Sequence, residues 1–381
     1  TWPKYLIGVQ VICTFITVST NSDPLRYGGV TIPGLREYDA LGVAFTRLVT
    51  IGVPFFLGMR IIKTYEDVLA VLRVIVFFGL VYLPLVLWEV RMSPQLHTTL
   101  YGYFPNIFAL HLRAGGFRPV VFTSSGLELA LFMATAVIAS AGLMHTRLRM
   151  FGLPPIVPFL GLLVGLALCK GLGSLMYGIL VPALILATKP AWQARVILLL
   201  SAVVLLYPLL RSQYLFPTET FVEGADVVSA ERAHSLKFRF DNEDRLLDKA
   251  SERPLFGWGT WGRNRVYDRT TGLDESITDG YWIIEMGTFG LTGFLSFFIL
   301  LLAPMVLVAR KLRVLPPGRP RVLIVTLALL VLIRAVDLIP NAFPAPFVLF
   351  LAGALVPFGK IALDRVIVRD QRPSISGANA S

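Results

Sequence analysis

The segment SITDGYWIIEMGTFG, residues 276–290, places a carboxylate directly before a long apolar run. Asp279 is therefore expected at the mouth of a helix bundle, where partial loss of water makes a carboxyl group a better general base. Aspartate is also strongly favoured at helix N-termini, because its side chain caps free backbone N–H groups. The two roles are compatible, so Asp279 is a predicted helix cap and the first candidate for a catalytic base.

Four basic residues are candidates for binding a phosphate-bearing ligand: Arg118, Lys170, Arg239 and Arg245. An arginine fork binds phosphate through two parallel N–H bonds. Lys170 lies between two apolar runs with almost no loop, where an ionisable side chain is costly to hold and is a functional candidate. The alternative for Lys170, and equally for Arg118, is that the long side chain extends to the membrane surface and places its charge in water. For Arg239 and Arg245, in KFRFDNEDR, the alternative is a solvated surface.

The segment RPLFGWGTWGR, residues 253–263, contains the spacing G-x-G-x-x-G. In nucleotide-binding folds this spacing follows a strand and opens a helix, whereas here it lies between apolar runs of a hydrophobic chain. The sequence instead predicts a turn close to a membrane surface, where tryptophan rings favour the interface. Two glycines would shape this turn and two tryptophans would anchor it: Gly257, Gly259, Trp258 and Trp261.

The elements that position these residues are predicted to be membrane helices. Of the 381 residues 55% are hydrophobic and 15% charged, and the mean hydropathy is +0.69. The apolar runs approach the roughly 20 residues that a helix needs to cross a bilayer, and they lack the alternation of a barrel strand. We therefore predict an all-α polytopic fold with about ten spans, near residues 5–20, 39–59, 68–90, 125–144, 154–169, 171–188, 194–210, 281–309, 322–339 and 343–360.

Charge in the short connections predicts the orientation of these spans. The basic connections all fall on one side under strict alternation, and the positive-inside rule makes that side the cytoplasm. They contain Arg60, Lys63, Arg147, Arg149, Lys189, Arg195, Arg310, Lys311, Arg313, Arg319, Arg321, Lys360, Arg365, Arg369 and Arg372. Residues 1–210 then contain seven membrane helices, and residues 281–360 contain three more. Between them, residues 211–280 form a large extracytoplasmic loop with short helices. Residues 361–381 form a disordered cytoplasmic tail. Segment 91–124 also lies outside, and both termini are cytoplasmic.

The composition of the chain limits the classes of ligand and partner that we expect. The net charge of +11 is accounted for by this topology signal and by attraction to membrane lipids, so no nucleic acid is expected. The four histidines lack ligand spacing and the two cysteines lie far apart in apolar runs, so no metal, cofactor or disulfide is predicted. Arg47, Arg73 and Arg334 fall inside predicted spans, the last with Asp337 one turn on as a structural pair. The chain begins without methionine, which favours a native start before Thr1.

Four segments together resemble the O-antigen ligase and O-antigen polymerase superfamily of GT-C-type membrane glycosyltransferases. In that family a P-x-x-G-x-G turn closes a large outer loop, and a short polar motif opens the next helix. Order and spacing carry the resemblance, which covers the chain from about Phe117 onward. The segments are FRPVVFTSSGLELALFM (117–133), CKGLGSLMYG (169–178), RPLFGWGTWGR (253–263) and TDGYWIIEMGTFGLTGF (278–294).

The resemblance implies a metal-independent, inverting enzyme that transfers or polymerises a polyprenyl-diphosphate-linked glycan at the outer face of the bacterial inner membrane. It implies diphosphate-binding roles for Arg118, Lys170 and Arg239 or Arg245, and a glycan or lipid acceptor. Ligases carry histidine and asparagine where Asp279 and Gly280 stand here, which favours a polymerase over a ligase acting on lipid A-core. A transporter of a lipid-linked or small substrate is the alternative, and it predicts broken helices and internal symmetry.

Overall fold

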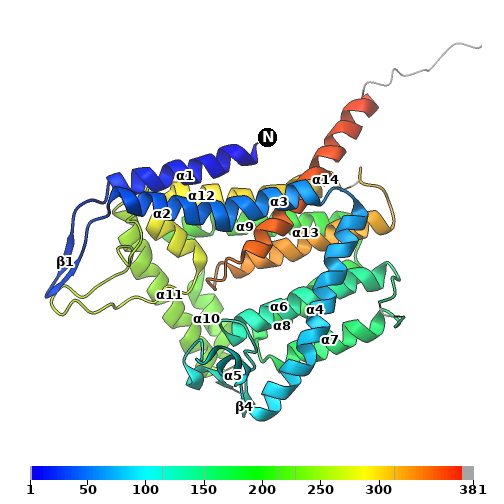
Figure 1. The fold of residues 1–381 in the computed structure, drawn as a ribbon, viewed down its shortest axis with the longest axis horizontal. Coiled ribbons are helices and arrows are strands. Elements are labelled where there is room, and N and C mark those ends of the chain that lie inside the picture. The colour runs from blue at the N-terminus through cyan, green and yellow to red at the C-terminus, as the bar shows by residue number, and fades with distance from the viewer. Residues whose placement is uncertain are drawn as a thin grey trace, which may run out of the picture. The chain divides into compact units, whose positions relative to one another are not determined.

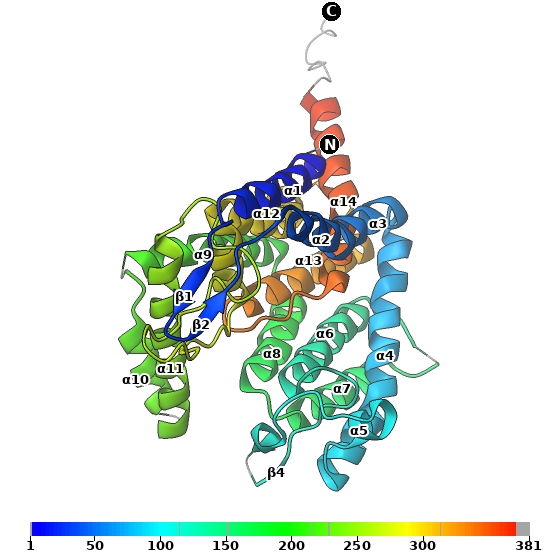
Figure 2. The ribbon, with the colours of Figure 1, turned by 60° about the vertical axis from the view of Figure 1, so that its left-hand side comes forward.

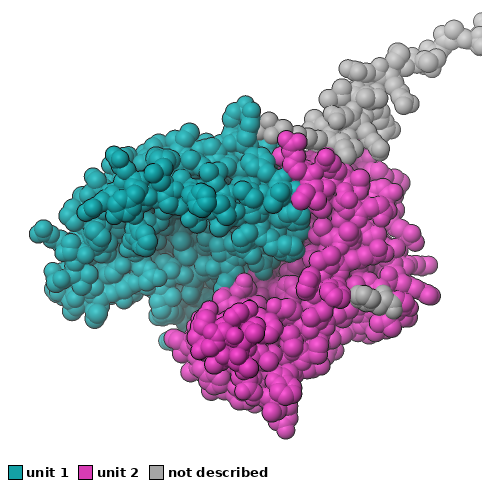
Figure 3. Space-filling view, viewed as in Figure 1, with its two compact units in different colours: residues 1–58, 199–304, 334–353 teal, residues 59–198, 305–333, 354–381 magenta. Residues whose placement is uncertain are grey.

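The computed structural model describes residues 2–113, 115–150, 152–213, 215–227, 229–312 and 314–370. Arg313, Arg372 and the end of the predicted tail, 371–381, lie outside these ranges. The described chain is mostly helical, as the sequence predicts, with two small antiparallel hairpins that the sequence does not predict (Figure 1). The chain divides into two compact units, and each is described by itself (Figure 3).

Unit 1 comprises residues 1–58, 199–304 and 334–353. It contains all or part of α1 (Pro3–Ser19), β1 (Leu25–Tyr27), β2 (Val30–Ile32), α2 (Glu37–Arg47), a π-helical turn (Leu48–Gly52), α3 (Val53–Ile61), α9 (Pro190–Ser212), α10 (Thr218–Asp226), α11 (Ala230–Ser251), α12 (Tyr281–Arg310) and α14 (Pro346–Asp370). α11, with 22 residues, is longer than the short helices expected within 211–280. α14 continues past the predicted end at residue 360 to Asp370.

Turns, loops and a short hairpin lie at one end of α1 and α2. We call residues 20–36 together with 253–280 the cap. Its hairpin, β1 and β2, projects past the ends of both helices, and the loop around residue 270 runs beside it (Figures 1 and 2). The Tyr27 and Tyr267 rings stack with centroids 5.1 Å apart. A Cβ at Gly28 would lie 2.1 Å from the Thr270 carbonyl oxygen, so glycine allows the two segments to meet.

Unit 2 comprises residues 59–198, 305–333 and 354–381. It contains α4 (Tyr65–Met92), α5 (Leu96–Tyr101), a 3-10 turn (Phe108–His111), β3 (Leu112–Arg113), β4 (Gly116–Phe117), α6 (Gly126–His145), α7 (Ile156–Leu168), α8 (Leu172–Ala187), most of α13 (Arg319–Asp337) and the remaining parts of α3, α9, α12 and α14. α6 is the centre of this unit, with α4, α7 and α8 packed around it. Its small side chains permit close helix contacts: a Cβ at Gly79 of α4 would lie only 2.6 Å from that of Ala136.

Five helical stretches of the described chain are long and apolar enough to cross a membrane: Glu37–Ile61, Tyr65–Met92, Gly126–His145, Pro190–Ser212 and Tyr281–Arg310. The apolar helices α1, α7, α8 and the first part of α14 are shorter. Helices occupy the positions of all the predicted spans. Length and composition support five crossings, so the larger number stays a prediction.

α12 is interrupted at Gly290, where φ is 65° and ψ is −166°. The cap segment 254–259 fills the interruption through four backbone N–H···O bonds of 2.7–3.2 Å: Leu291 to Pro254, Thr292 to Leu255, Trp258 to Gly287 and Gly259 to Thr288. Unpaired backbone groups cost several kcal/mol each in hydrocarbon. The inserted segment therefore allows a membrane-length helix to be broken about 14 Å from its first residue.

Candidate functional site

Asp279 forms an ion pair with Arg239 of α11 in unit 1. Arg239 Nε lies 3.4 Å from Asp279 Oδ2, and the two side chains are 31% and 37% exposed. The guanidinium also donates from Nη1 to the Pro340 carbonyl oxygen at 3.4 Å. Water and a small ligand can therefore reach the pair, while Pro340 holds the arginine from one side.

The carboxylate of Asp279 is not used as a helix cap. α12 begins at Tyr281, which puts Gly280 at the cap position. The Tyr281 N–H donates to the carbonyl oxygens of Leu338 and Asn341. Among the hydrogen bonds of the described residues, none runs from the first turn of α12 to Asp279, so the predicted capping role is wrong and the carboxylate serves the ion pair.

Arg245 lies on a different side of α11 from Arg239. Six residues turn an α-helix by about 600°, which separates the two side chains by about 120°. Arg245 is exposed, and within the described chain it makes no ion pair. Of the two arginines paired by the sequence analysis, Arg239 is the one that reaches Asp279.

Arg118 and Lys170, far apart in sequence, come together in unit 2. The buried Arg118 donates from Nη2 to the Lys170 carbonyl oxygen at 2.9 Å. A Cβ at Gly116 would lie 2.7 Å from Lys170 Nζ, so the ammonium group packs over the β3–β4 hairpin. Two of the predicted phosphate ligands thus form one basic cluster next to the start of α6.

Backbone strain marks the same part of unit 2. Lys170 and Val121 both have φ of 52°, a region that is unusual for any side chain and an outlier for a β-branched one. Glu89, fully buried on α4, accepts the N–H groups of Val120 and Val121, each at 2.7 Å. Strain of about 1–3 kcal/mol persists only where surroundings enforce it, and here a buried carboxylate does so.

Of the predicted loop-shaping residues, Gly257, Trp258 and Gly259 lie at the contact between the cap and α12, whereas Trp261 contacts α2. Gly257 has φ of 69°, and a Cβ there would lie 2.5 Å from the Thr288 carbonyl. Gly259 has φ of 84°, and a Cβ there would lie 2.2 Å from the Leu35 side chain. Trp258 is buried, whereas Trp261 is 70% exposed and donates its indole N–H to Asp39 at 3.1 Å. The glycines thus permit close approach of backbones and form no nucleotide loop.

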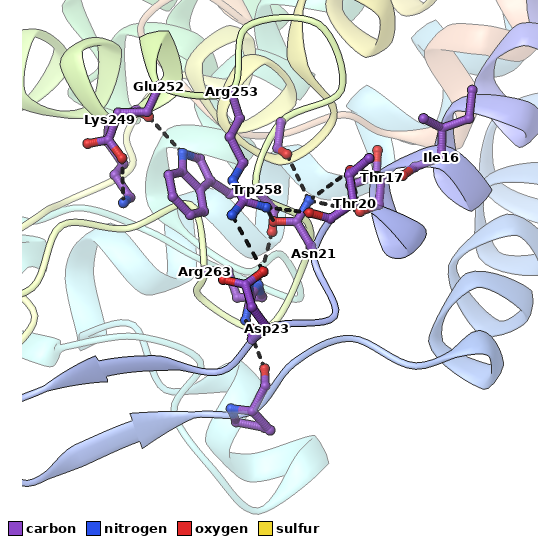
Figure 4. Close-up of polar contacts among 12 residues, drawn as sticks. Ile16, Thr17, Thr20, Asn21, Asp23, Lys249, Glu252, Arg253, Trp258 and Arg263 are labelled. Carbon is purple, nitrogen blue, oxygen red and sulfur yellow. Dashed lines mark hydrogen bonds and ion pairs between the residues drawn. The ribbon is translucent and has the colours of Figure 1, made fainter.

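Two arginines tie the cap to the end of α1 around Asp23 (Figure 4). Arg253 Nη2 lies 3.5 Å and Arg263 Nη2 3.6 Å from the same carboxylate oxygen. Arg253 also donates to the Asn21 side chain at 2.7 Å, and the fully buried Arg263 donates to the carbonyl oxygens of Asp23 and Pro33. The sequence alone does not single out these residues, because their partners lie more than 200 positions away.

A buried charge pair that spacing does not reveal joins α2 to α12. Arg47 donates to both carboxylate oxygens of Glu285 at 3.2 and 3.0 Å, and the side chains are 7% and 3% exposed. The Tyr281 hydroxyl donates to Glu285 at 2.5 Å, and the guanidinium lies 4.1 Å from the centre of the Phe289 ring. An acidic residue inside an apolar run indicates by itself a functional or paired charge, and Glu285 is such a residue.

A second buried carboxylate fixes α11, the helix that holds Arg239. Glu243 accepts the Tyr207 hydroxyl at 2.8 Å and the Trp282 indole N–H at 3.3 Å, and lies 3.3 Å from Arg211 Nε. Burial raises the pKa of Glu243, although the Tyr207 hydrogen bond and the Arg211 charge oppose this. Trp282 is three residues after Asp279, so this cluster fixes both partners of the ion pair.

Comparison of the chain with protein families, with curated proteins and with solved structures finds no match.

Proposed function

We propose that this chain is a multi-pass glycosyltransferase of the bacterial inner membrane, similar to O-antigen and exopolysaccharide polymerases. It would transfer or polymerise a polyprenyl-diphosphate-linked glycan at the outer face. The observation that supports this most is the open pair of Asp279 and Arg239 beside a membrane-length helix. The pair combines a candidate base with a guanidinium suited to phosphate.

In the proposed reaction, an acceptor hydroxyl oxygen attacks the anomeric carbon of the donor sugar opposite the diphosphate. The new C–O bond forms as the bond to the diphosphate oxygen breaks, and polyprenyl diphosphate leaves with the electron pair. The hydroxyl proton passes to Asp279. This single displacement inverts the anomeric carbon, and nearby cations neutralise the charge that develops on the leaving group.

Arg239 links donor binding to the base. The N–H group that faces Asp279 cannot serve a diphosphate at the same time, and a diphosphate carries more negative charge than one carboxylate. Donor binding would draw the guanidinium away and leave Asp279 open to the acceptor hydroxyl. Arg118 and Lys170 are the alternative diphosphate ligands, and variants of each group tell the two possibilities apart.

The number of membrane spans and their orientation are part of the same proposal. About ten spans, cytoplasmic termini and an extracytoplasmic segment 211–280 would put Asp279 on the periplasmic or outer side. The distribution of Lys and Arg supports this orientation. Labelling of single cysteines in whole cells tests it: a cysteine at the exposed Thr271 of the cap should react with an impermeant reagent, and protection in intact cells would contradict the orientation.

The deciding experiment incubates the purified protein with a polyprenyl-diphosphate oligosaccharide. A ladder of longer lipid-linked chains identifies a polymerase. Product that forms only after addition of lipid A-core or another acceptor identifies a ligase. Unchanged donor under both conditions refutes glycan transfer.

Variants then test the residues. Asp279→Asn should lower turnover by about 10²–10⁴-fold, as expected for a lost general base, while Asp226→Asn on the exposed surface of α10 should not. Arg239→Ala should weaken donor binding about tenfold or more, and Arg245→Ala on the other side of α11 should have little effect. If donor binding is lost in Arg118→Ala and kept in Arg239→Ala, the diphosphate site lies in unit 2.

Transport is the second candidate, because α12 is broken within a membrane-length stretch, as transporters require. In transporters such a break leaves carbonyl groups free to bind an ion or a substrate. Here the carbonyl oxygens of Gly287, Thr288 and Phe289 accept the Trp258 N–H, the Gly259 N–H and the Cys13 thiol. The break is filled by the protein itself, which favours glycan transfer over transport.

A further inference from the structure

A cavity of about 340 Å³ opens at the end of α1 in unit 1. Its lining consists of Thr20, directly after α1, and the cap segment Arg253–Gly257. Pro254 and Leu255 are exposed there, and Phe256 is half-buried. Arg253 is the charged member of this lining. The cavity therefore combines an apolar wall with one guanidinium, the pattern that an amphiphile with an anionic headgroup requires.

Arg253 is held in place but keeps donors for a ligand. Its Nη1 donates to the Thr20 carbonyl oxygen at 2.5 Å and to Asn21 at 2.7 Å, and Nη2 lies 3.5 Å from Asp23 (Figure 4). Its guanidinium also stacks 4.2 Å from the centre of the Trp258 ring. A guanidinium has five N–H groups, so two are left over by these contacts within the described chain.

The surroundings carry a small positive charge. Three cations, Lys249, Arg253 and Arg263, face two carboxylates, Asp23 and Glu252, in this cluster. The net charge of one plus complements a phosphodiester, which carries one negative charge. A diphosphate carries more charge than this cluster neutralises.

α1 offers a continuous apolar surface below the cavity. Tyr5, Val9 and Ile12 are exposed, Ile16 is half-buried, and all lie on the same side of the helix as Thr20. The 17 residues of α1 extend about 26 Å, close to the thickness of a hydrocarbon layer. With α1 as one of the predicted spans, Thr20 and Arg253 would lie at the depth of phosphate groups, and the exposed side of α1 at the depth of acyl chains.

We propose that this cavity binds an anionic phospholipid of the bilayer. The phosphate would accept N–H groups of Arg253, the glycerol would lie against Leu255 and Thr20, and one acyl chain would follow the exposed side of α1. The bound lipid would fasten the cap to the membrane surface at the point where the cap segment enters the break of α12. The site is separate from Asp279 and does not depend on the proposed enzymatic reaction.

Native mass spectrometry of the delipidated, full-length protein tests this proposal with phosphatidylglycerol and phosphatidylcholine added at equal concentration. The wild type should retain phosphatidylglycerol about tenfold better. Thr20→Phe fills the cavity while both arginines are kept, and it should abolish the preference. Ser19→Phe adds the same ring at the neighbouring exposed position outside the cavity and should leave the preference unchanged.

Equal retention of the two lipids by the wild type would overturn the proposal, as would equal behaviour of the two phenylalanine variants. Displacement of phosphatidylglycerol by an equal amount of polyprenyl diphosphate would also overturn it, because the cavity would then belong to a glycan donor. If Thr20→Phe does not fold, Leu255→Trp fills the same cavity from an exposed position and takes its place in the comparison.

Discussion

Removal of the negative charge from the buried pair of Arg47 and Glu285 should destabilise unit 1 strongly. Glu285→Gln keeps the shape of the side chain but leaves the Arg47 guanidinium, 7% exposed, without its counterion. Breaking a buried ion pair from one side costs about 3–5 kcal/mol, because the remaining charge stays desolvated. In a membrane-length segment water cannot enter easily to compensate, so we expect the upper part of this range.

Thermal unfolding of the detergent-solubilised protein measures this effect. With about 2–4 °C of melting temperature per kcal/mol, Glu285→Gln should lower the midpoint by about 8 °C or more. Glu252→Gln is the matched control, because its pair with Lys249 has a similar distance of 3.2 Å but its carboxylate is 56% exposed. Such exposed pairs contribute about 1 kcal/mol or less, which corresponds to a shift of at most about 4 °C.

A double variant distinguishes the loss of the ion pair from the free-energy cost of one buried charge left without a partner. Arg47→Met combined with Glu285→Leu removes both charges, and a buried pair replaced by apolar side chains is often nearly neutral. The double variant should therefore be more stable than either single variant. The reasoning is refuted if Glu285→Gln shifts the midpoint no more than Glu252→Gln, or if the double variant loses the sum of both single effects.

Two further predictions concern the cap and α11. Gly257→Ala should lower the free energy of unfolding by about 2 kcal/mol or more, since its Cβ would lie 2.5 Å from the Thr288 carbonyl at a φ of 69°. The control is Gly29→Ala, which should cost little because a Cβ there would meet nothing within 4 Å. Equal effects of the two variants would contradict the close approach at Gly257. Burial raises the pKa of Glu243, so the folded protein should lose stability as pH rises from about 4.3 through that raised pKa. Glu243→Gln should lack this component, and melting profiles of variant and wild type that run parallel with pH would argue against it.

The helices could be predicted from the sequence better than their connections. Long apolar runs produce helices whatever the surroundings, and each predicted span indeed falls on a helix. The interruption of α12 was not predictable, because Gly290 lies in an apolar run and the segment that fills the break is remote from it. The length of the helix within 211–280 is also greater than predicted, since α11 is a mostly polar helix whose buried side combines a few apolar residues, Leu246, Leu247 and Ala250, with buried Glu243.

The candidate site was predictable in residue type but not in pairing. An acid before an apolar run and arginines in polar segments identify Asp279 and Arg239 as candidates, but neither spacing nor composition shows that they meet. The contact depends on α11 folding back beside the start of α12. Glu285 was overlooked for a related reason: its partner is 238 positions away, so only the tertiary structure shows that this charge is satisfied.

The filled break in α12 also bears on how the protein is made. Residues 254–259 leave the ribosome shortly before residues 287–292, so these two segments can pair as soon as both have been synthesised. The bonds from α1 to the same region join residues 236–276 positions apart: Cys13 to Phe289, Thr17 to Phe256 and Asn21 to Gly257. Until they form, the interrupted start of α12 lacks these contacts. Completion of this part of the fold therefore requires that the first helix remain accessible while most of the chain is made.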